Sequence, residues 1–362
     1  MPGHALPDYH GEERIGARDR IPVAISCEEY PVDPDRRIVD AHIHLHHPGA
    51  GKPVYRLDEM LVDTRAGHNI THVVFVEAGT AYLDFGPPAL RSVGETEFVA
   101  GEARLSRSHE TEVAAIIAFA DLTLGDGLED VLEGHEAVGK GLFRGIRHAT
   151  AWDSSAAIHV GGWRGWSNPS SGLMMEPTFR RGVAQLGQKG YCYEAYLYHP
   201  QIAELAALAR ATEDTLIVLD HLGVPLNVGP YQDRDAVRAI WKSGLQDLAA
   251  CPNAVLKLGG IGMKWLYGPA SPGHERPPSS DEVVSYWGDD LRWCIETFGP
   301  DRCMFESNFP VDGRSLNYTV IWNSFQKIAS IYSTNEQRDL FAGTAARVYS
   351  ITSGDDSDIN NL

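Results

Sequence analysis

Short runs of apolar and β-branched residues recur along the chain, separated by longer stretches in which apolar positions return every three or four residues. The short runs have the length and composition of buried strands. Two of the longer stretches, residues 201–211 and 281–298, have helical composition and spacing. We expect eight strands, at residues 38–45, 70–76, 113–120, 142–147, 191–197, 216–219, 254–258 and 303–305.

The alternation of strands and helices predicts the α/β class, with βα units and a parallel sheet. Eight strands is the number that a closed (β/α)8 TIM barrel requires, so we predict this fold. A doubly wound open sheet gives a similar pattern and is the alternative. The chain has 362 residues, which suits one such barrel with insertions.

Both ends of the chain lack this periodicity. Residues 1–36 are polar and contain proline, which predicts an N-terminal arm that packs on the domain or on a neighbouring subunit. We expect the barrel to span residues 37–350 and a flexible C-terminal tail to follow at 351–362. Packing on a neighbour would explain an ordered arm most simply, so a homo-oligomer is one option, and the sequence leaves the oligomeric state open.

Two predicted loops are long and rich in Gly, Pro, Ser and Trp. They cover residues 151–176, after the fourth strand, and residues 264–280, after the seventh. Loops that follow strands gather at the catalytic face of a barrel, so these insertions predict a lid or the walls of a pocket. Surface decoration is the alternative. Trp163 in the first loop is a candidate contact for a flat, apolar substrate.

The composition narrows the choice of partner and compartment. The 49 acidic and 31 basic residues give a formal charge of −18, which would repel nucleic acid and anionic lipid and favours a small-molecule substrate. The sequence contains no apolar stretch of the roughly 20 residues that a membrane helix needs. Its five cysteines form no Cys-x-x-Cys pair and no signal peptide is recognisable, so we expect the reducing cytoplasm.

The segment Asp-Ala-His-Ile-His at residues 40–44 falls at the C-terminal end of the first expected strand. Because side chains alternate across a strand, Asp40, His42 and His44 are expected to share one face. Two imidazoles one pleat apart can bind one metal ion. A hydrogen-bonded histidine pair at a strand end is the alternative.

Histidines also follow two later strands. His221 comes directly after the run 216–219 within Asp-His-Leu-Gly, and His199 follows the run 191–197 just before a proline. The C-terminal ends of parallel barrel strands meet at one face, so four imidazoles from three strands are expected at the same rim. Packing alone explains poorly why four histidines follow three different strands. Their positions therefore predict an active site at this rim.

With these motifs, the chain resembles the amidohydrolase superfamily, in the amidohydrolase-2 branch that includes 2-pyrone-4,6-dicarboxylate lactonase and L-fuconolactonase. The resemblance implies a (β/α)8 barrel whose strand 1 histidines, strand 6 histidine and strand 8 acid form a hydrolytic centre. Some members hold a divalent metal there, and some lactonases work without one. The resemblance covers residues 38–310 and rests on the ordered motifs at 40–44, 144–148, 199–200, 220–223 and 307–310.

The chain departs from this family in its last strand. The usual motif is Ser-Asp-x-Pro, whereas residues 307–310 read Ser-Asn-Phe-Pro. The amide of Asn308 cannot accept a proton as a carboxylate does, so the family role of base or anionic ligand does not transfer directly. We retain Asn308 as a weak oxygen ligand or as a residue that orients water or a substrate carbonyl.

Several residues are candidates for the general base. We place His221 or His199 first, Asp312 second and Glu306 third. By strand alternation Glu306 faces the same side as Asn308, one pleat deeper. A buried ion pair of Glu306 with Lys257 or with an arginine of the fourth strand is the alternative.

Four residues are candidate substrate contacts besides Trp163. Arg144 and Arg147 fall on opposite faces of the fourth strand, and the resemblance favours Arg147 as a clamp for a carboxylate or carbonyl, with an inter-strand ion pair as the alternative. Arg144 and Lys257 are further substrate-binding candidates. Tyr196 is a candidate donor to an oxyanion, and ordinary barrel packing is the other explanation for it.

The predicted activity is hydrolysis of a lactone or related carboxylic ester of a small, aromatic or flat apolar substrate, by attack of water on the carbonyl. The predicted catalytic residues are His42, His44, Arg147, His199, His221 and Asn308. A zinc or manganese ion would be held by His42, His44, His221 and Asn308, and a centre without metal is the alternative. A metal-dependent decarboxylase of an aromatic or unsaturated acid and a binding barrel that has lost catalysis are the rival functions.

Overall fold

A computed structural model describes residues 29–48, 52–159, 169–263, 266 and 276–352. Within them, eight parallel strands pair in sequence order. Every predicted strand is present, with its ends displaced by no more than two residues. The strands are β1 (Arg37–Ile43), β2 (Asn69–Val76), β3 (Glu112–Ala118), β4 (Phe143–Arg147), β5 (Cys192–Ala195), β6 (Ile217–Leu219), β7 (Ala254–Leu258) and β8 (Cys303–Phe305).

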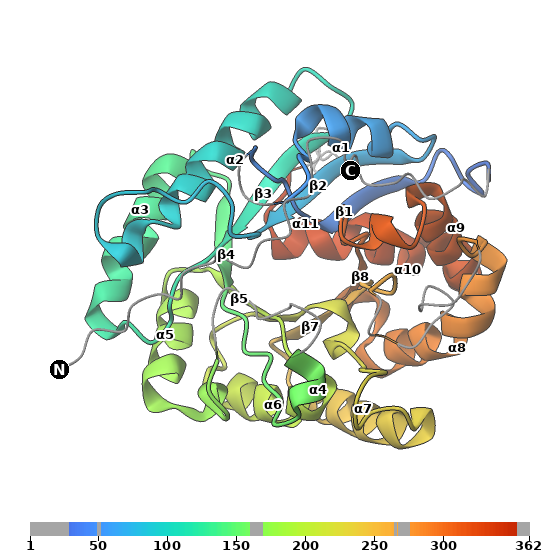
Figure 1. The fold of residues 1–362 in the computed structure, drawn as a ribbon. Coiled ribbons are helices and arrows are strands. Elements are labelled where there is room, and N and C mark those ends of the chain that lie inside the picture. Colours follow the sequence, from blue (N-terminus) through green and yellow to red (C-terminus); the bar gives the residue numbers. More distant parts are fainter. Residues whose placement is uncertain (1–28, 49–51, 160–168, 264–265, 267–275, 353–362) are drawn as a thin grey trace, which may run out of the picture.

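The sheet closes on itself through its first strand and the segment after its last strand. Ile43 forms a parallel bridge with Phe309. On either side of this bridge, His44 N donates to Phe309 O at 2.8 Å and Asn308 N donates to His42 O at 3.0 Å. The strands lie at the centre with the helices around them (Figure 1). The predicted (β/α)8 barrel is therefore confirmed, and the doubly wound open sheet is excluded.

The outer layer is helical, and both predicted helices are present within one residue of their expected starts. The helices are α1 (Leu57–Thr64), α2 (Val93–Ser106), α3 (Leu128–Gly139), α4 (Ala156–His159), α5 (Pro177–Gln188), α6 (Ile202–Ala211), α7 (Arg234–Ala249), α8 (Ser280–Phe298), α9 (Tyr318–Ala329), α10 (Thr334–Arg338) and α11 (Thr344–Val348). A π-helix, Asp339–Gly343, joins α10 to α11. Short 3₁₀ turns lie at Pro88–Leu90, Gly125–Gly127, Leu173–Met175, His199–Gln201, His221–Gly223, Pro300–Arg302 and Asp312–Arg314.

Local sequence sets the bounds of the longest helix. Before α8, the Ser279 hydroxyl accepts from Glu282 N at 3.3 Å, and the Glu282 carboxylate accepts from Ser279 N at 2.8 Å. This reciprocal pair satisfies two backbone donors that the helix start leaves without partners. The helix ends at Gly299, whose φ of 92° is open to glycine at little cost.

Strand alternation divides the apolar residues into two layers. In β2, Val74 and Val76 belong to a cluster inside the barrel, whereas Val73 and Phe75 belong to the larger cluster between strands and helices. A period of two places successive side chains on opposite faces of the strand. The inner layer is small, which leaves the upper interior to polar residues.

The C-terminal elements pack against the inner layer at the amino-terminal ends of the strands. Ala345 of α11 and the buried Tyr349 belong to the inner cluster. Arg144, second in β4, donates from Nε to Tyr349 O at 2.6 Å and from an NH group to Gly141 O at 2.7 Å. Arg144 thus lies at the opposite end of its strand from the catalytic face, and its predicted role in substrate binding is corrected.

Strict alternation fails in β1. The pairing of β1 with β2 shifts register after Asp40, and such an irregularity changes which face the following side chains occupy. Asp40 points toward the helices, where Tyr318 donates to its Oδ2 at 3.0 Å and Ser307 N to its Oδ1 at 2.9 Å. His42 and His44 point into the barrel. The prediction that all three share one face is wrong for Asp40, which braces β1 against β8 and α9.

The segment before β1 packs on α9. Val32 N donates to the Asn323 side chain and Asp33 N to the Gln326 side chain, both at 2.9 Å. The rest of the predicted arm, residues 1–28, and the tail from residue 353 lie outside the described residues. In the part of the chain that the structure describes, no helix has both the length and the apolar character to cross a membrane.

Both long loops follow the strands after which they were predicted. One connects β4 to α5 and contains α4, and the other connects β7 to α8. Residues 160–168, 264–265 and 267–275 lie outside the described residues. Trp163 is among them, so its role in substrate binding and the role of these loops as a lid stay predictions.

Candidate active site

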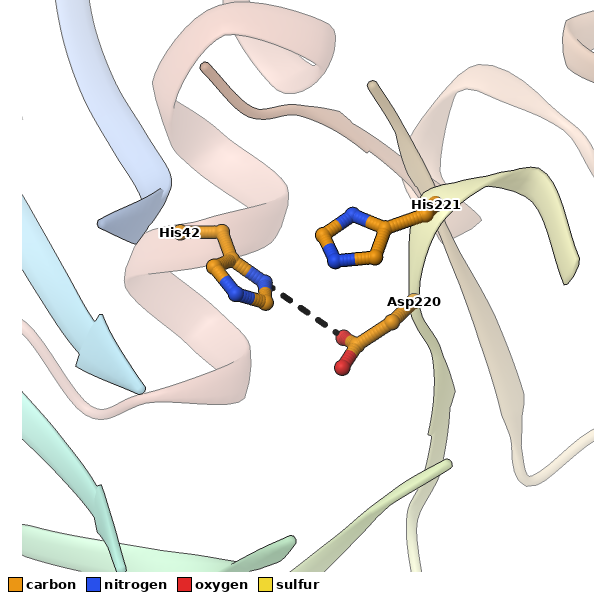
Figure 2. A group of neighbouring side chains, drawn as sticks. All are labelled: His42, Asp220 and His221. Carbon is orange, nitrogen blue, oxygen red and sulfur yellow. Dashed lines mark ion pairs between the residues drawn. The ribbon is translucent and has the colours of Figure 1, made fainter. Parts of the chain in front are cut away.

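Three buried polar side chains meet inside the barrel, at the C-terminal ends of β1 and β6 (Figure 2). His42 belongs to β1, while Asp220 and His221 directly follow β6. His42 Nδ1 lies 3.6 Å from Asp220 Oδ1, and one ligand atom from each of the three residues lies within 4.8 Å of the others. The structure therefore brings the predicted strand 1 and strand 6 histidines together.

Glu306 links the two imidazoles from the segment after β8. Its Oε1 accepts from His221 Nδ1 at 2.7 Å and from His221 N at 3.1 Å, and its Oε2 lies 2.9 Å from His42 Nδ1. Burial acts to raise the pKa of Glu306, but the two imidazoles outweigh it and hold the pKa well below its ordinary value. The residue ranked last among the candidate bases is thus a charged carboxylate of the centre, as Asp220 is.

His221 has the properties of a proton acceptor. Burial alone would lower the pKa of His221, but the Glu306 carboxylate outweighs it and raises the pKa above the ordinary value of 6.5. The bond to Glu306 places a proton on Nδ1 and leaves Nε2 as the basic nitrogen. Within the described residues, Nε2 forms no hydrogen bond.

A glycine-rich wall lies against these groups. Gly259, Gly260 and Gly262 follow β7, and a Cβ on Gly260 would meet His221 Cβ at 2.6 Å, while one on Gly259 would meet Glu306 Cγ at 2.3 Å. Gly260 also has a φ of +67°, a conformation that L side chains rarely adopt. The close approach of this backbone fixes where the imidazole and the carboxylate lie.

His44 faces His42 from the mouth side of the centre. The Nε2 atoms of the two rings are 3.3 Å apart, and His44 Nδ1 donates to Val76 O at 2.8 Å. Burial lowers the pKa of His42 to about 4 and that of His44 well below its ordinary value. Both rings are neutral near pH 7 and present nitrogen lone pairs to the centre.

Arg147 reaches the same centre from the end of β4. It donates from Nε to Glu77 Oε1 at 2.9 Å, and one of its terminal nitrogens lies 3.3 Å from both His42 Nε2 and Asp220 Oδ2. Burial acts to lower the pKa of Arg147, but Glu77 and Asp220 outweigh it and raise the pKa. The inter-strand ion pair, which was the alternative for Arg147, is therefore present, and its role as a clamp for the substrate stays a prediction.

Lys257 lies below the imidazoles, inside the barrel. Its ammonium is fully buried, 2.7 Å from Glu194 Oε2 and 3.3 Å from both Asp220 Oδ1 and His42 Nδ1. Tyr349 donates to the other oxygen of Glu194 at 2.5 Å. Lys257 is thus held by acids within the barrel, and its predicted role as a direct substrate contact is corrected.

Asn308 and Asp312 form a second polar group beside the centre. The Asn308 amide donates to Asp312 Oδ1 at 2.8 Å, and Gly262 N donates to Asp312 Oδ2 at 2.8 Å. Asn308 has a φ of 54°, so strand alternation has ended before it. The Asn308 amide nitrogen holds Asp312, and the predicted role of Asn308 as a ligand or catalytic residue stays a prediction.

His199 and Tyr196 have different positions. His199 lines a groove between α6 and α7, where its ring packs edge-on against Tyr231 at 4.9 Å, so its predicted catalytic role is corrected. Its strand ends early and a 3₁₀ turn carries it away from the centre. The buried Tyr196 lies at the centre, with its ring 5.9 Å from that of His221 and 6.0 Å from the Arg147 guanidinium.

Sequence reasoning missed three features of the site. Asp220 stands in the Asp-His-Leu-Gly motif, yet only its neighbour was assigned a role. Glu77 directly follows β2, and its position at a strand end was the available signal. The third is the run Gly-Gly-Ile-Gly at 259–262, where closely spaced glycines after a strand indicate a close backbone approach.

The donor set fits a divalent metal ion. Imidazole nitrogens and carboxylate oxygens are ligands that zinc accepts. Within the described residues, the buried oxygens Asp220 Oδ1 and Glu306 Oε2 form no hydrogen bond of good geometry, and their nearest partners are the Lys257 ammonium at 3.3 Å and His42 Nδ1 at 2.9 Å. These buried oxygens have room for a further, better placed partner, which a divalent cation bound by His42, Asp220 and His221 would supply.

A parallel (β/α)8 barrel with histidines, acids and an arginine at the C-terminal ends of its strands defines an enzyme of the hydrolase class. The profile described as amidohydrolase (Amidohydro_2) matches residues 39–351. The chain belongs to this family, as its motifs predicted.

Two relatives and one solved structure illustrate the similarity. The uncharacterised protein y4mH of Sinorhizobium fredii is 29% identical over 339 residues, which cover 88% of the chain and 99% of that protein. L-fucono-1,5-lactonase of Burkholderia multivorans is 28% identical over 245 residues, 67% of the chain and 73% of the lactonase. The crystal structure of a Burkholderia multivorans amidohydrolase with bound zinc has a TM-score of 0.66 at 23% identity and covers 88% of this chain and 100% of that one.

Proposed function

We propose that the protein hydrolyses a lactone or related carboxylic ester of a small molecule. The observation that carries this proposal is the pairing of His221 with Glu306. The His221 imidazole is buried, its Nδ1 donates to a carboxylate, and its Nε2 forms no hydrogen bond within the described residues. Such an imidazole is a base suited to activating water. The similarity to L-fucono-1,5-lactonase supports the same reaction class.

The residues of the centre account for each proton in the reaction. Water attacks the carbonyl carbon while His221 Nε2 takes its proton. The carbonyl oxygen gains negative charge, which the fixed guanidinium of Arg147 stabilises from beside His42. The acyl C–O bond then breaks, and His221 returns the proton to the leaving alkoxide, which yields a hydroxy acid from a lactone.

A zinc or manganese ion is part of the proposal as an alternative way to activate the water. His42, Asp220 and His221 would hold it, and when bound it would lower the pKa of water and polarise the carbonyl. The structural similarity to a zinc-containing amidohydrolase supports this alternative only at the level of the fold. His221 Nε2 cannot be a base and a ligand at once, so the metal content of the active enzyme decides its role.

The proposed partner is a small-molecule substrate, and the proposed compartment is the reducing cytoplasm. Cys192, Cys251, Cys294 and Cys303 are all buried thiols without disulfide partners within the described residues, which favours a reducing compartment. Assembly into a homo-oligomer through the N-terminal segment stays a prediction.

The test is a panel of sugar lactones, aromatic lactones and simple esters, followed by proton release and by CO2 release. We expect protons without CO2, loss of turnover in His221→Gln, and full activity in the control His109→Gln, whose imidazole bonds Arg65 far from the centre. CO2 release would replace the proposal with a decarboxylase. Absence of any turnover would favour a binding barrel.

Metal analysis of protein purified without chelator completes the test. Stoichiometric metal, and activity that chelation removes and added zinc or manganese restores, would assign His221 as a ligand. Full activity with no bound metal would assign it as the base.

A further inference from the structure

A group of buried polar side chains inside the barrel has no part in the proposed reaction. Lys257 of β7, Glu194 of β5 and Tyr349, which follows α11, are all fully buried. The Lys257 ammonium lies 2.7 Å from Glu194 Oε2, and the Tyr349 hydroxyl donates to Glu194 Oε1 at 2.5 Å. Each oxygen of the Glu194 carboxylate therefore has its own partner, and the three side chains form one chain of contacts.

The upper end of this chain reaches the proposed catalytic centre. Lys257 Nζ lies 3.3 Å from Asp220 Oδ1 and 3.3 Å from His42 Nδ1. The other oxygen of Asp220, Oδ2, lies 3.3 Å from a terminal nitrogen of Arg147. Asp220 is thus held between two cations, one of which is the arginine that faces the developing negative charge in the proposed reaction.

The lower end of the chain is fixed at the amino-terminal ends of the strands. Arg144 Nε donates to Tyr349 O at 2.6 Å, and Tyr349 N donates to Ala345 O at 3.0 Å. Tyr349 and Ala345 also belong to the inner apolar cluster. Arg144 therefore helps to hold the residue whose hydroxyl begins the chain, and the contacts run along the inside of the barrel from that end to the centre.

Stability alone does not account for a buried ion pair at this position. Removing two charges from water costs free energy that their attraction does not always return, and well-packed apolar side chains of similar volume are often at least as stable. Lys257 and Glu194 are nevertheless enclosed within the barrel at 0% exposure. Such a pair can instead fix the geometry of the groups that it contacts, which here are Asp220 and His42.

We propose that Lys257, Glu194 and Tyr349 are positioning residues for the hydrolytic centre. Lys257 holds Asp220 from below, and Asp220 in turn holds Arg147. Glu194 and Tyr349 fix the position of Lys257. The inference rests on the proposed hydrolase function and adds the residues that set its geometry. The C-terminal segment at the opposite end of the barrel would thereby influence turnover without contacting the substrate.

The first experiment removes only the hydroxyl at the lower end of the chain. Tyr349→Phe keeps the ring but leaves Glu194 Oε1 without its donor. Because catalytic geometry tolerates little displacement, we expect kcat to fall about 3- to 30-fold with KM nearly unchanged. The matched control is Tyr193→Phe, which removes a buried hydroxyl of β5 that donates to His148 O at 3.0 Å, among the residues between strands and helices. A kcat unchanged in Tyr349→Phe, or lowered equally in Tyr193→Phe, would overturn the inference and leave the hydrolase intact.

Two combinations of substitutions separate positioning from stability. In a Glu194→Gln background, adding Tyr349→Phe should lower kcat no further, because the hydroxyl acts through that carboxylate. Glu194→Leu combined with Lys257→Met should keep a melting temperature close to that of the wild type while kcat falls about 10²-fold. Additive losses in the first pair, or an unchanged kcat in the second, would contradict the inference. If the second pair does not fold, Tyr349→Phe and its control decide.

A measurement without substrate separates this inference from the proposed function. The imidazole nitrogen NMR signals of a histidine depend on which ring nitrogen carries the proton and on the hydrogen bond that each nitrogen makes. At fixed pH, the His42 signals, identified by their loss in His42→Asn, should move in Tyr349→Phe and stay in place in Tyr193→Phe. The signals of His135, which bonds Thr96 at 2.8 Å, should stay in place in both.

The two measurements fail in different ways. If no lactone is turned over, the hydrolase loses its support and the NMR signals alone decide the positioning role. His42 signals that move in Tyr349→Phe but not in Tyr193→Phe would support that role, and unmoved His42 signals would overturn it.

Discussion

Glu306 and Asp312 lie on the same segment after β8, and both are fully buried, yet the structure shifts their pKa values in opposite directions. The pKa of Glu306 is held well below its ordinary value, while burial raises the pKa of Asp312 to about 7. Glu306 faces two imidazoles, which can carry positive charge. Asp312 faces Gly262 N and the Asn308 amide, which donate hydrogen bonds without a formal charge.

The comparison shows that burial alone does not decide the charge of a carboxyl group. Desolvation raises the pKa in both cases, and at Glu306 the charges and hydrogen bonds of His221 and His42 reverse it. Glu306 is therefore suited to orient and charge His221, and Asp312 to brace the wall beside it. If this contrast is right, equivalent substitutions in the two groups must have unequal effects.

The largest difference should come from removing each charge with an isosteric amide. Glu306→Gln takes away the negative charge that faces His221 Nδ1 and should lower kcat/KM about 10³-fold, the range of general base catalysis. Asp312→Asn imitates the protonated group and should lower it less than about tenfold. Steady-state kinetics on the best lactone of the panel measures both. Similar losses in the two variants would show that the charge contrast does not matter for catalysis.

The glycine wall offers a second, smaller contrast. Gly260→Ala would place a Cβ 2.6 Å from His221 Cβ and strain a φ of +67°, so we expect a loss of about 10- to 100-fold in kcat/KM. Gly262→Ala would press on Asp312 Cβ at 2.8 Å and should cost less activity. Gly125→Ala is the control, because its φ is +61° and its Cβ would meet nothing within 4 Å. A lower unfolding temperature in a variant would report backbone strain. A loss of activity at an unchanged unfolding temperature would report displacement of the site.

The pH profile tests the electrostatic link directly. For a metal-free enzyme, kcat/KM should rise with pH as His221 loses its proton, with a midpoint above 6.5. Glu306 is the strongest influence that raises this pKa, so Glu306→Gln should move the midpoint to lower pH. A shift of about one unit corresponds to about 1.4 kcal/mol. A midpoint unmoved in Glu306→Gln, or moved equally in Asp312→Asn, would contradict the assignment.

The smallest effect concerns stability. Because the fold raises the pKa of Asp312 from 3.8 to about 7, its contribution to stability is complete below pH 3.8 and is lost as pH rises through about 7. Asp312→Asn cannot ionise, so it should be about 1 to 2 kcal/mol more stable than the wild type at pH 8 and show little difference at pH 4. Urea unfolding at the two pH values measures this. A variant equally destabilised at both would show that the carboxyl is charged in the fold.

Local patterns predicted most of the fold. Each strand is a short apolar run whose length and composition do not depend on distant residues, and all eight were predicted with their order. His42, His44 and His221 were predicted at the rim for the same reason, because a residue at the end of a parallel barrel strand must face the catalytic side. Their convergence follows from topology alone.

Predictions that assumed ideal alternation beyond the strands were wrong or incomplete. A register shift in β1 turned Asp40 away from His42, and the 3₁₀ turn after β5 took His199 to the groove between α6 and α7. Asn308 adopts a positive φ, so the strand pattern no longer describes its direction. Each departure is a single backbone irregularity that strand periodicity does not detect.

The sequence by itself determined the barrel, the family and the histidines of the centre, because strand periodicity and strand-end motifs are local properties. Only the tertiary structure decided that the pKa of Glu306 is lowered, that the pKa of its neighbour Asp312 is raised, and that Lys257 lies beneath the site. Charge states in a barrel interior depend on which side chains from other strands lie within about 3 to 4 Å, where the low dielectric magnifies each contact. The distances between side chains of different strands are set when the sheet closes into a barrel.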